Sequence, residues 1–180
     1  AILRRLRRAY PDAGIMLRYS NNWELLVAVI LSAQCTDKKV NEVTAALFKK
    51  YRTLGDYTGA KQKEFERLIR PTGFFRAKTK NILAAARMIK EKFNGRVPQT
   101  MEEMLTLPGV ARKTANVVLG NAYGVVEGIA VDTHVRRLSQ RLGFSPTDNP
   151  EKIERNLMDI IPEKDWFKTT YLLIDHGRAI

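Results

Sequence analysis

The sequence predicts an all-α protein. Apolar residues recur every three or four positions over residues 37–50 and 76–93, which is the period of one helix face. Residues 23–34 (WELLVAVILSAQ) are apolar almost all round, as is typical of a buried central helix. Apolar and polar residues alternate nowhere long enough to form a strand, and the nearest candidate, residues 129–131, is too short.

The remaining elements follow from helix caps and breakers. Asn21 or Asn22 is placed to cap the first turn of the apolar helix. Proline and glycine mark four breaks, at residues 71–73, 94–98, 124–130 and 143–150. Between these breaks the pattern predicts further helices near residues 100–105, 112–123, 133–142, 150–160 and 164–178.

Composition limits the class of protein and its partners. With 180 residues, of which 44% are hydrophobic, the chain can bury the core of one or two small domains. The 31 Lys and Arg residues against 19 Asp and Glu give a net charge of +12. This excess favours a polyanionic partner, nucleic acid ahead of a membrane surface, although charge that only aids solubility is the alternative.

The sequence also bears on localisation and metal content. The longest apolar run, residues 25–31, is far shorter than the roughly 20 residues that cross a bilayer, and no signal-peptide pattern opens the chain. We therefore expect a cytoplasmic protein that is not secreted, associated with the nucleoid in a bacterium or archaeon. The single cysteine, Cys35, can form neither an internal disulfide nor a thiolate cluster.

The most informative segment is LTLPGVARKTANVVLG at residues 105–120. A short helix over residues 101–105, a tight turn and a second helix from Arg112 predict a helix-hairpin-helix. Pro108 fixes one backbone angle and Gly109 permits a positive one, so the turn can direct free N–H groups outward at a helix N-terminus. Such a site favours a DNA phosphate. The alternative is an ordinary connection between two helices.

Four motifs resemble those of one family in order and approximate spacing. They are LSAQCTD at 31–37, LPGVARKTANVV at 107–118, IAVDTHVRRL at 129–138 and HGR at 176–178. The chain thereby resembles the endonuclease III family of DNA glycosylases over essentially its whole length. The resemblance implies a base-excision repair enzyme that removes oxidised pyrimidines and then cleaves the strand on the 3′ side.

The resemblance also implies an architecture and a partner. It places a six-helix domain at residues 16–126, with the helix-hairpin-helix near 100–120, and builds a second helical domain from residues 1–15 and 127–180. The DNA-binding cleft of the family lies between the two domains. The expected partner is double-stranded DNA that contains damaged bases or abasic sites, bound by a monomer.

Lys113 and Asp132 are the catalytic residues that the resemblance implies. Lys113 would attack C1′ of the damaged nucleotide and form a Schiff base that permits β-elimination. Asp132 would stabilise positive charge on the sugar and move protons. Without the family, Lys113 is a phosphate-binding or solvated lysine, and Asp132 is the N-cap of the helix that follows it. Capping and catalysis can coexist at Asp132.

Gln34 and Phe74 are the candidates for filling the gap that an extruded nucleotide leaves in the duplex. The family assigns a plugging glutamine at the position of Gln34, and Phe74 stands where the family has a wedge leucine. Side chains that fill this void hold the flipped state. The alternatives are a helix C-terminal amide for Gln34 and a core aromatic for Phe74.

Other motif residues complete the predicted site. The hairpin residues expected to bind DNA are Leu107, Gly109, Val110, Ala111, Arg112 and Thr114. Three further residues, Ser32, Asp37 and His134, could line the base pocket, and each is equally well explained by a capping or core role. Ala111 replaces a second hairpin glycine of the family, which is tolerable if its φ is negative.

One departure from the family concerns iron. Most members carry a four-cysteine loop for a [4Fe–4S] cluster, and that loop would begin where this sequence stops, at Ile180. We expect no cofactor on residues 1–180, and a [4Fe–4S] cluster in a longer protein if a four-cysteine loop follows Ile180. A family member without the cluster is the alternative.

Two other functions stay open at this point. A glycosylase of the same superfamily could act on 8-oxoguanine or adenine, although the adenine-specific branch generally lacks a lysine at the position of Lys113. A helix-hairpin-helix module could also bind DNA without catalysis. The sequence does not rank individual pyrimidine lesions.

Overall fold

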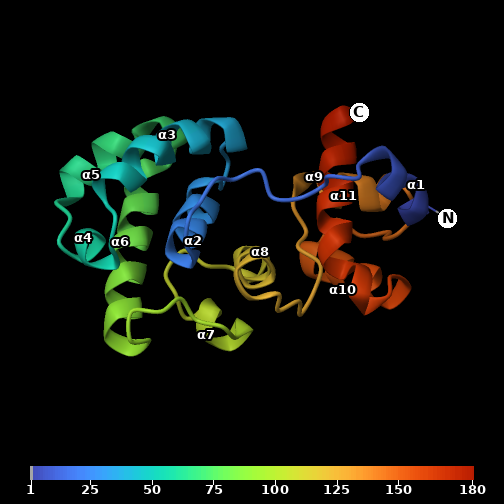
Figure 1. Cartoon of the computed structure of the whole chain (residues 1–180). Helices are drawn as coiled ribbons and strands as arrows, with labels where there is room; N and C mark the ends of the chain where they lie inside the picture. The colour runs from blue at the N-terminus through green and yellow to red at the C-terminus, as the bar shows by residue number, and fades with distance from the viewer. Residues whose placement is uncertain (1) are drawn as a thin grey trace. The chain divides into compact units, whose positions relative to one another are not determined.

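The computed structural model describes residues 2–180, which are helical and contain no strand (Figure 1). The prediction of an all-α fold is confirmed. The α-helices are α1 (Ile2–Ala9), α2 (Asn22–Leu31), α3 (Asp37–Lys50), α4 (Leu54–Thr58), α5 (Gln62–Ile69), α6 (Phe75–Lys92), α7 (Met101–Leu105), α8 (Arg112–Tyr123), α9 (Thr133–Arg141), α10 (Pro150–Ile160) and α11 (Trp166–Ala179). Two short 3-10 helices are η1 (Arg70–Thr72) and η2 (Glu163–Asp165).

Contacts divide the chain into two compact units. The central unit comprises Met16–Tyr123, and the terminal unit combines the residues up to Ile15 with Gly124–Ile180. None of the helices over residues 2–180 is both long and apolar enough to cross a membrane.

Helix α2 forms the core of the central unit. Its side chains from Trp23 to Leu31 are buried, and it packs against α8, α3 and α6 (Figure 1). The Asn21 side chain accepts a hydrogen bond from the backbone N–H of Glu24 at 2.9 Å, so Asn21 is the cap. The predicted end at Gln34 was wrong, because the helix stops at Leu31 and residues 32–35 form a turn.

Periodicity did not single out α4, α5 and η1, which follow α3. Helices α4 and α5 contribute Tyr57 and Phe65 to a cluster of aromatic residues in which Tyr57 lies 5.3 Å from Tyr51 and 5.8 Å from Phe65 between ring centroids. All three rings are buried. Helices α4 and α5 have only 5 and 8 residues, too few for a helical period to be recognised in the sequence.

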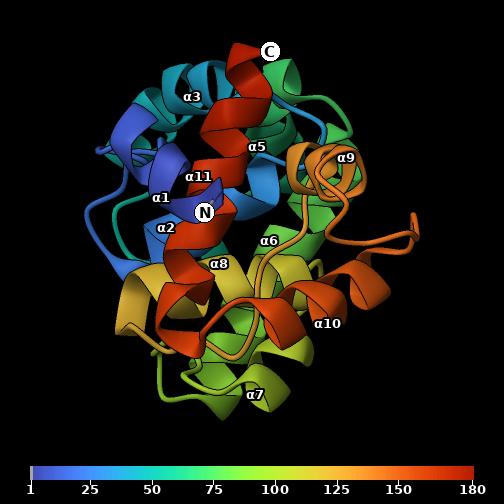
Figure 2. The same ribbon diagram turned by 90° about the vertical axis from the view of Figure 1, so that its right-hand side faces the viewer.

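Helix α11 organises the terminal unit by packing against α9 and α1 (Figure 2). The approach of α9 is close, since a Cβ atom added at Gly177 would lie 2.8 Å from the Cβ of His134. The Arg137 guanidinium donates to the Gly177 carbonyl. The Tyr10 hydroxyl lies 3.0 Å from His176 Nδ1, which ties the segment after α1 to α11. The HGR motif therefore has packing partners in this chain.

Candidate active site and DNA interface

The predicted helix-hairpin-helix is formed by α7, the turn over residues 106–111, and α8, and the two helices pack against each other. The Val110 N–H donates to the Leu107 carbonyl at 3.2 Å, and Gly109 has a φ of 79°. Proline at the second position and a positive φ at the third are the pattern of a type II turn. The Asn81 side chain of α6 lies directly behind Gly109. The hairpin is thus closed on the side of α6.

Lys113 is the second residue of α8 and is exposed. The first N–H groups of a helix lack intrahelical acceptors, and they give this end a partial positive charge. The backbone here can hold a phosphate while the Lys113 amine stays accessible. This arrangement suits a nucleophile that must reach a sugar on bound DNA.

The hairpin residues divide into buried and accessible groups. Leu107 is only 2% exposed and Val110 is buried with it, so a contact of either with DNA would come from its backbone. Ala111 is exposed and does not have a positive φ, so alanine at this position carries no left-handed strain. Arg112 and Thr114 are half-buried.

Phe74 lies in the turn between η1 and α6. Its side chain is 65% exposed, and its backbone is left-handed, with a φ of 46°. A core role for this aromatic ring is therefore wrong. A large exposed apolar side chain on a strained turn is free to enter an opened duplex.

Gln34 lies in the turn that follows α2 and resembles Phe74 in two respects. It is exposed, and its φ of 53° is also left-handed. Non-glycine residues seldom adopt this conformation, and strained residues of this kind cluster at functional sites.

Lys78, which the sequence analysis did not single out, connects these two turns. Its side chain is 5% exposed, and its Nζ donates to the Leu31 carbonyl at 2.8 Å and to the Thr72 carbonyl at 2.7 Å. One signal could have found it, because Lys78 falls on the apolar face of α6 with Ile82. A lysine on a buried helix face requires a partner.

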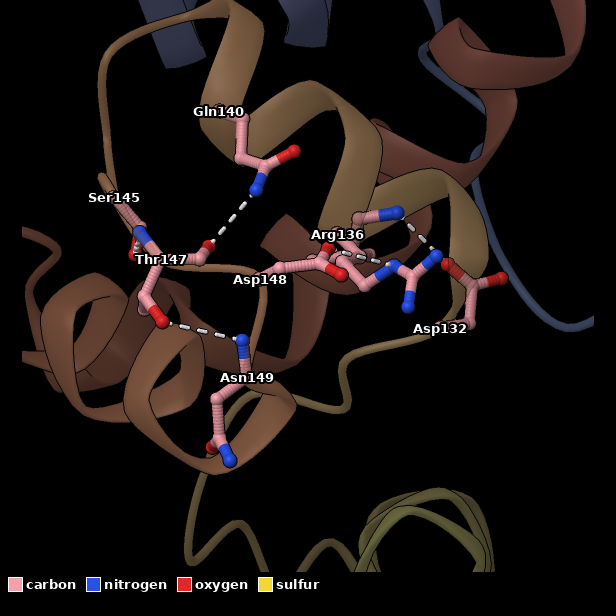
Figure 3. Close-up of polar contacts among 8 residues, drawn as sticks. Asp132, Arg136, Gln140, Ser145, Thr147, Asp148 and Asn149 are labelled. Carbon is pink, nitrogen blue, oxygen red and sulfur yellow. Dashed lines mark hydrogen bonds and ion pairs between the residues drawn. The ribbon is translucent and has the colours of Figure 1, made fainter.

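Asp132 belongs to the terminal unit, where it caps α9. Its Oδ1 accepts from the Val135 N–H at 2.8 Å. One turn further along α9, Arg136 pairs with Asp148 at 3.2 Å (Figure 3). The predicted capping role is present, and the half-buried carboxyl group retains a second oxygen.

The loop between α9 and α10 supports this end of the terminal unit (Figure 3). The Gln140 side chain donates to the Thr147 carbonyl at 3.1 Å, and the Asn149 N–H donates to Thr147 Oγ1 at 3.2 Å. The Gln140 bond and the Arg136–Asp148 pair fasten the loop to α9, and the Asn149 bond orders the loop itself.

The three base-pocket candidates have local structural roles. The Ser32 hydroxyl donates to the Val29 carbonyl at 2.8 Å and so helps to end α2. Asp37 is the first residue of α3, where a carboxylate suits the helix dipole. His134 packs against Gly177. Ser32 and Asp37 flank the Gln34 turn, whereas His134 is in the terminal unit.

The described residues do not fit an iron–sulfur cluster. A [4Fe–4S] cluster takes four thiolates, and this sequence has one cysteine. Within residues 2–180, no group of three or more His, Cys, Asp or Glu side chains is placed to hold a metal ion.

Comparison with known proteins places the chain in a family. The family model described as "HhH-GPD superfamily base excision DNA repair protein" matches residues 27–163. Endonuclease III of Synechocystis sp. is 55% identical over 179 residues, which cover 99% of this chain and 82% of that protein. The chain belongs to the endonuclease III family. The family resemblance of its four motifs is confirmed.

Other endonuclease III proteins and solved structures agree. The Bacillus subtilis protein is 47% identical over 94% of this chain and 77% of its own length. The structure of a trapped endonuclease III–DNA covalent intermediate, an estranged-adenine complex, has a TM-score of 0.95 and 48% identity, covering 98% of this chain and 83% of that one. A thermostable thymine-DNA glycosylase, at 20% identity and a TM-score of 0.83, shares the fold.

Proposed function

We propose that this protein is a base-excision repair DNA glycosylase with AP lyase activity that acts on oxidised pyrimidines in double-stranded DNA. The observation that carries the proposal is the exposed Lys113, which follows the hairpin turn directly at the start of α8. The 48% identical endonuclease III with a TM-score of 0.95 was trapped as a covalent intermediate with DNA, which requires a nucleophile on the protein.

Lys113 acts as the nucleophile in the proposed reaction. Its uncharged amine attacks C1′ of the flipped nucleotide, a C–N bond forms, and the bond from C1′ to the base breaks. Ring opening then gives a Schiff base between Nζ and C1′. Loss of a proton from C2′ expels the 3′ phosphate by β-elimination, and water finally releases the sugar from the lysine.

Asp132 acts on charge and protons. Its carboxylate stabilises the positive charge that develops on the sugar and moves protons during ring opening. In the free protein one carboxylate oxygen accepts the N–H of Val135, and the cap fixes the orientation of the group.

Binding relies on three segments of the central unit. The hairpin from Leu107 to Arg112 holds a phosphate with backbone N–H groups. Gln34 and Phe74, both exposed on strained turns, fill the space that the extruded nucleotide vacates. All of these contacts come from one copy of the chain, so the protein acts as a monomer. Because its substrate is chromosomal DNA, it acts at the nucleoid.

No step of this reaction is assigned to an iron–sulfur cluster. The bond changes at C1′ and C3′ are carried by an amine and a carboxylate of this chain. If a longer form of the protein has a four-cysteine loop after Ile180, that loop would hold the cluster of the family.

Borohydride trapping on a duplex with one abasic site tests the nucleophile. The wild-type protein is expected to form a reduced covalent complex, and Lys113→Gln is expected to form none. Affinity for DNA should persist in Lys113→Gln, since several phosphate contacts contribute and the substitution removes one charge.

Lys90→Gln is the matched control, because Lys90 is an exposed lysine at the opposite end of α6 from Phe74. It should trap like the wild type. Full trapping by Lys113→Gln would overturn the assignment, and DNA binding without trapping by the wild type would favour a non-catalytic module. Duplexes that each carry one lesion, including 8-oxoguanine and an adenine mispair, then decide the substrate.

A further inference from the structure

The side chain of Lys78 crosses the interior of the central unit to reach two backbone carbonyls. One belongs to Leu31, the last residue of α2, and the other to Thr72, the last residue of η1. The two distances, 2.8 and 2.7 Å, are those of strong charge-assisted hydrogen bonds. Leu31 is three residues before Gln34, and Thr72 is two residues before Phe74.

The Leu31 carbonyl is the acceptor that the turn after α2 does not satisfy. The Ala28 and Val29 carbonyls accept from Ser32, and the Ile30 carbonyl accepts from the Ala33 N–H. The next carbonyl along the chain, that of Leu31, accepts from Lys78 Nζ instead. A cation here also suits the negative end of the helix dipole of α2.

The turn before α6 is held at one end by the Lys78 side chain and at the other by the first backbone hydrogen bond of α6. The backbone N–H of Lys78 donates to the Phe74 carbonyl at 3.0 Å, while its Nζ binds the Thr72 carbonyl. The turn thus has one Lys78 bond on each side of Gly73. Its two left-handed residues, Gly73 and Phe74, lie between these bonds.

Strain makes this support necessary. Gln34 and Phe74 have φ angles of 53° and 46°, and such residues keep this conformation only when their surroundings enforce it. An ammonium group has three N–H donors and can serve two carbonyls at once, which no apolar side chain can do.

We propose that Lys78 is a positioning residue that holds the Gln34 and Phe74 turns in one fixed arrangement, so that both side chains are preorganised to enter opened DNA. This inference rests on the void-filling roles given to these two residues in the proposed function. Burial lowers the pKa of the Lys78 ammonium, and the Leu31 and Thr72 carbonyls replace the hydrogen bonds that the group would make with water.

Hydrogen exchange of the free protein tests the support directly. In Lys78→Met the backbone N–H groups of residues 32–36 and 72–75 are expected to exchange at least about tenfold faster, whereas those of the terminal unit keep their rates. Lys90→Met removes an exposed lysine from the same helix and should change neither segment. Faster exchange over the whole central unit, or none at the two turns, would overturn the proposal.

DNA affinity tests the consequence. Lys78→Met should weaken binding to a duplex with a tetrahydrofuran abasic analogue about tenfold more than binding to the undamaged duplex, because void filling matters only where a base is missing. In a double-mutant cycle with Phe74→Ala, the two losses should be far from additive. Equal losses on both duplexes, or additive losses, would show that Lys78 only stabilises the fold.

Two arms keep the outcome interpretable. Lys78→Gln retains an N–H donor on a side chain one atom shorter, so it should give an intermediate loss and serves if Lys78→Met does not fold. Borohydride trapping of the wild type reports the proposed function independently. If trapping fails there, hydrogen exchange still decides whether Lys78 holds the two turns.

Discussion

Asp132 combines a structural bond with a proposed chemical role. Since asparagine is as good an N-cap as aspartate, Asp132→Asn is expected to retain the melting temperature within a few degrees while base excision slows at least about a hundredfold. Asp132→Ala should lose the cap as well, at about 1 kcal/mol of unfolding free energy. Single-turnover excision and thermal melts measure both effects.

Asn149 provides the control for capping alone. It caps α10 through the Lys152 N–H at 3.0 Å, and no catalytic role is proposed for it. Asn149→Ala should therefore lower the melting temperature like the loss of any cap, but leave the excision rate per folded molecule unchanged. A cap-like melting loss in Asp132→Asn, without slower excision, would leave Asp132 with a structural role only.

Gln34 and Phe74 carry a prediction about discrimination. Gln34→Ala and Phe74→Ala should each weaken binding to abasic-analogue DNA about tenfold and binding to undamaged duplex much less. Gln34→Gly deletes the same amide but relieves the left-handed backbone. It should therefore bind both duplexes like Gln34→Ala and melt at a higher temperature than Gln34→Ala.

Ile160→Ala is the control for removing an exposed apolar side chain, because Ile160 is 55% exposed at the end of α10. It should alter binding to neither duplex. Competition binding with both duplexes in one experiment gives the ratio of the affinities for abasic-analogue and undamaged DNA directly. Parallel losses on the two duplexes would count against void filling.

At the scale of elements, the hairpin depends on Gly109. Its φ is 79°, and an added Cβ would lie 2.8 Å from both the Cβ and the Nδ2 of Asn81. Gly109→Ala is therefore expected to destabilise the protein by about 1–3 kcal/mol and to weaken binding to damaged and undamaged DNA alike, because phosphate contacts serve both.

Variants at Gly143 and Asn81 distinguish the backbone strain in Gly109→Ala from its steric clash with Asn81. Gly143 has a φ of 70° with open space around its Cβ position, so Gly143→Ala carries the strain alone. Adding Asn81→Gly to Gly109→Ala removes the whole Asn81 side chain, including the Cβ that the new methyl group would meet, and should restore part of the lost stability. If Gly109→Ala costs no more than Gly143→Ala in denaturant melts, the close approach of α6 does not limit the hairpin.

The aromatic cluster around α4 predicts an alkaline transition. Burial raises the pKa of the Tyr57 phenol, and the nearby Glu24 charge adds to the shift. In the unfolded chain the Tyr57 phenol ionises near pH 10, whereas in the folded chain it keeps its proton. The contribution of Tyr57 to the free energy of unfolding is therefore complete below about pH 10 and is lost as the pH rises further. Tyr57→Phe should show a shallower fall in unfolding free energy above pH 10. An unchanged slope would contradict this.

At the scale of the molecule, the net charge of +12 predicts strong salt dependence. The logarithm of the DNA affinity should fall linearly with the logarithm of salt concentration, and each lost phosphate contact should reduce that slope by about 0.9. Arg112→Gln in the hairpin is expected to reduce the slope by this amount. Arg155→Gln, on the exposed face of α10, is expected to leave the slope unchanged. Equal slopes for the wild type and Arg112→Gln would remove Arg112 from the interface.

Features that depend on neighbours along the chain can be predicted from the sequence. The sequence predicts a helix over residues 37–50 and further helices near 112–123 and 150–160, and α3, α8 and α10 lie there, because period, caps and breakers all act within a few positions. A cap at Asn21 or Asn22 and a positive φ at Gly109 follow from local chemistry in the same way, and the structure places the cap at Asn21. The four motifs in their order along the chain are sufficient for the family.

Features that depend on residues far apart in the chain could be seen only in the folded structure. Lys78 lies 47 positions from Leu31, so no local pattern reveals that its amine pairs with the last carbonyl of α2. The end of α2 at Leu31, the exposure of Phe74 and the packing of Asn81 behind Gly109 likewise follow from where other segments lie. A buried polar group must find its partner in space, and spatial proximity is set by the packed fold rather than by spacing along the chain.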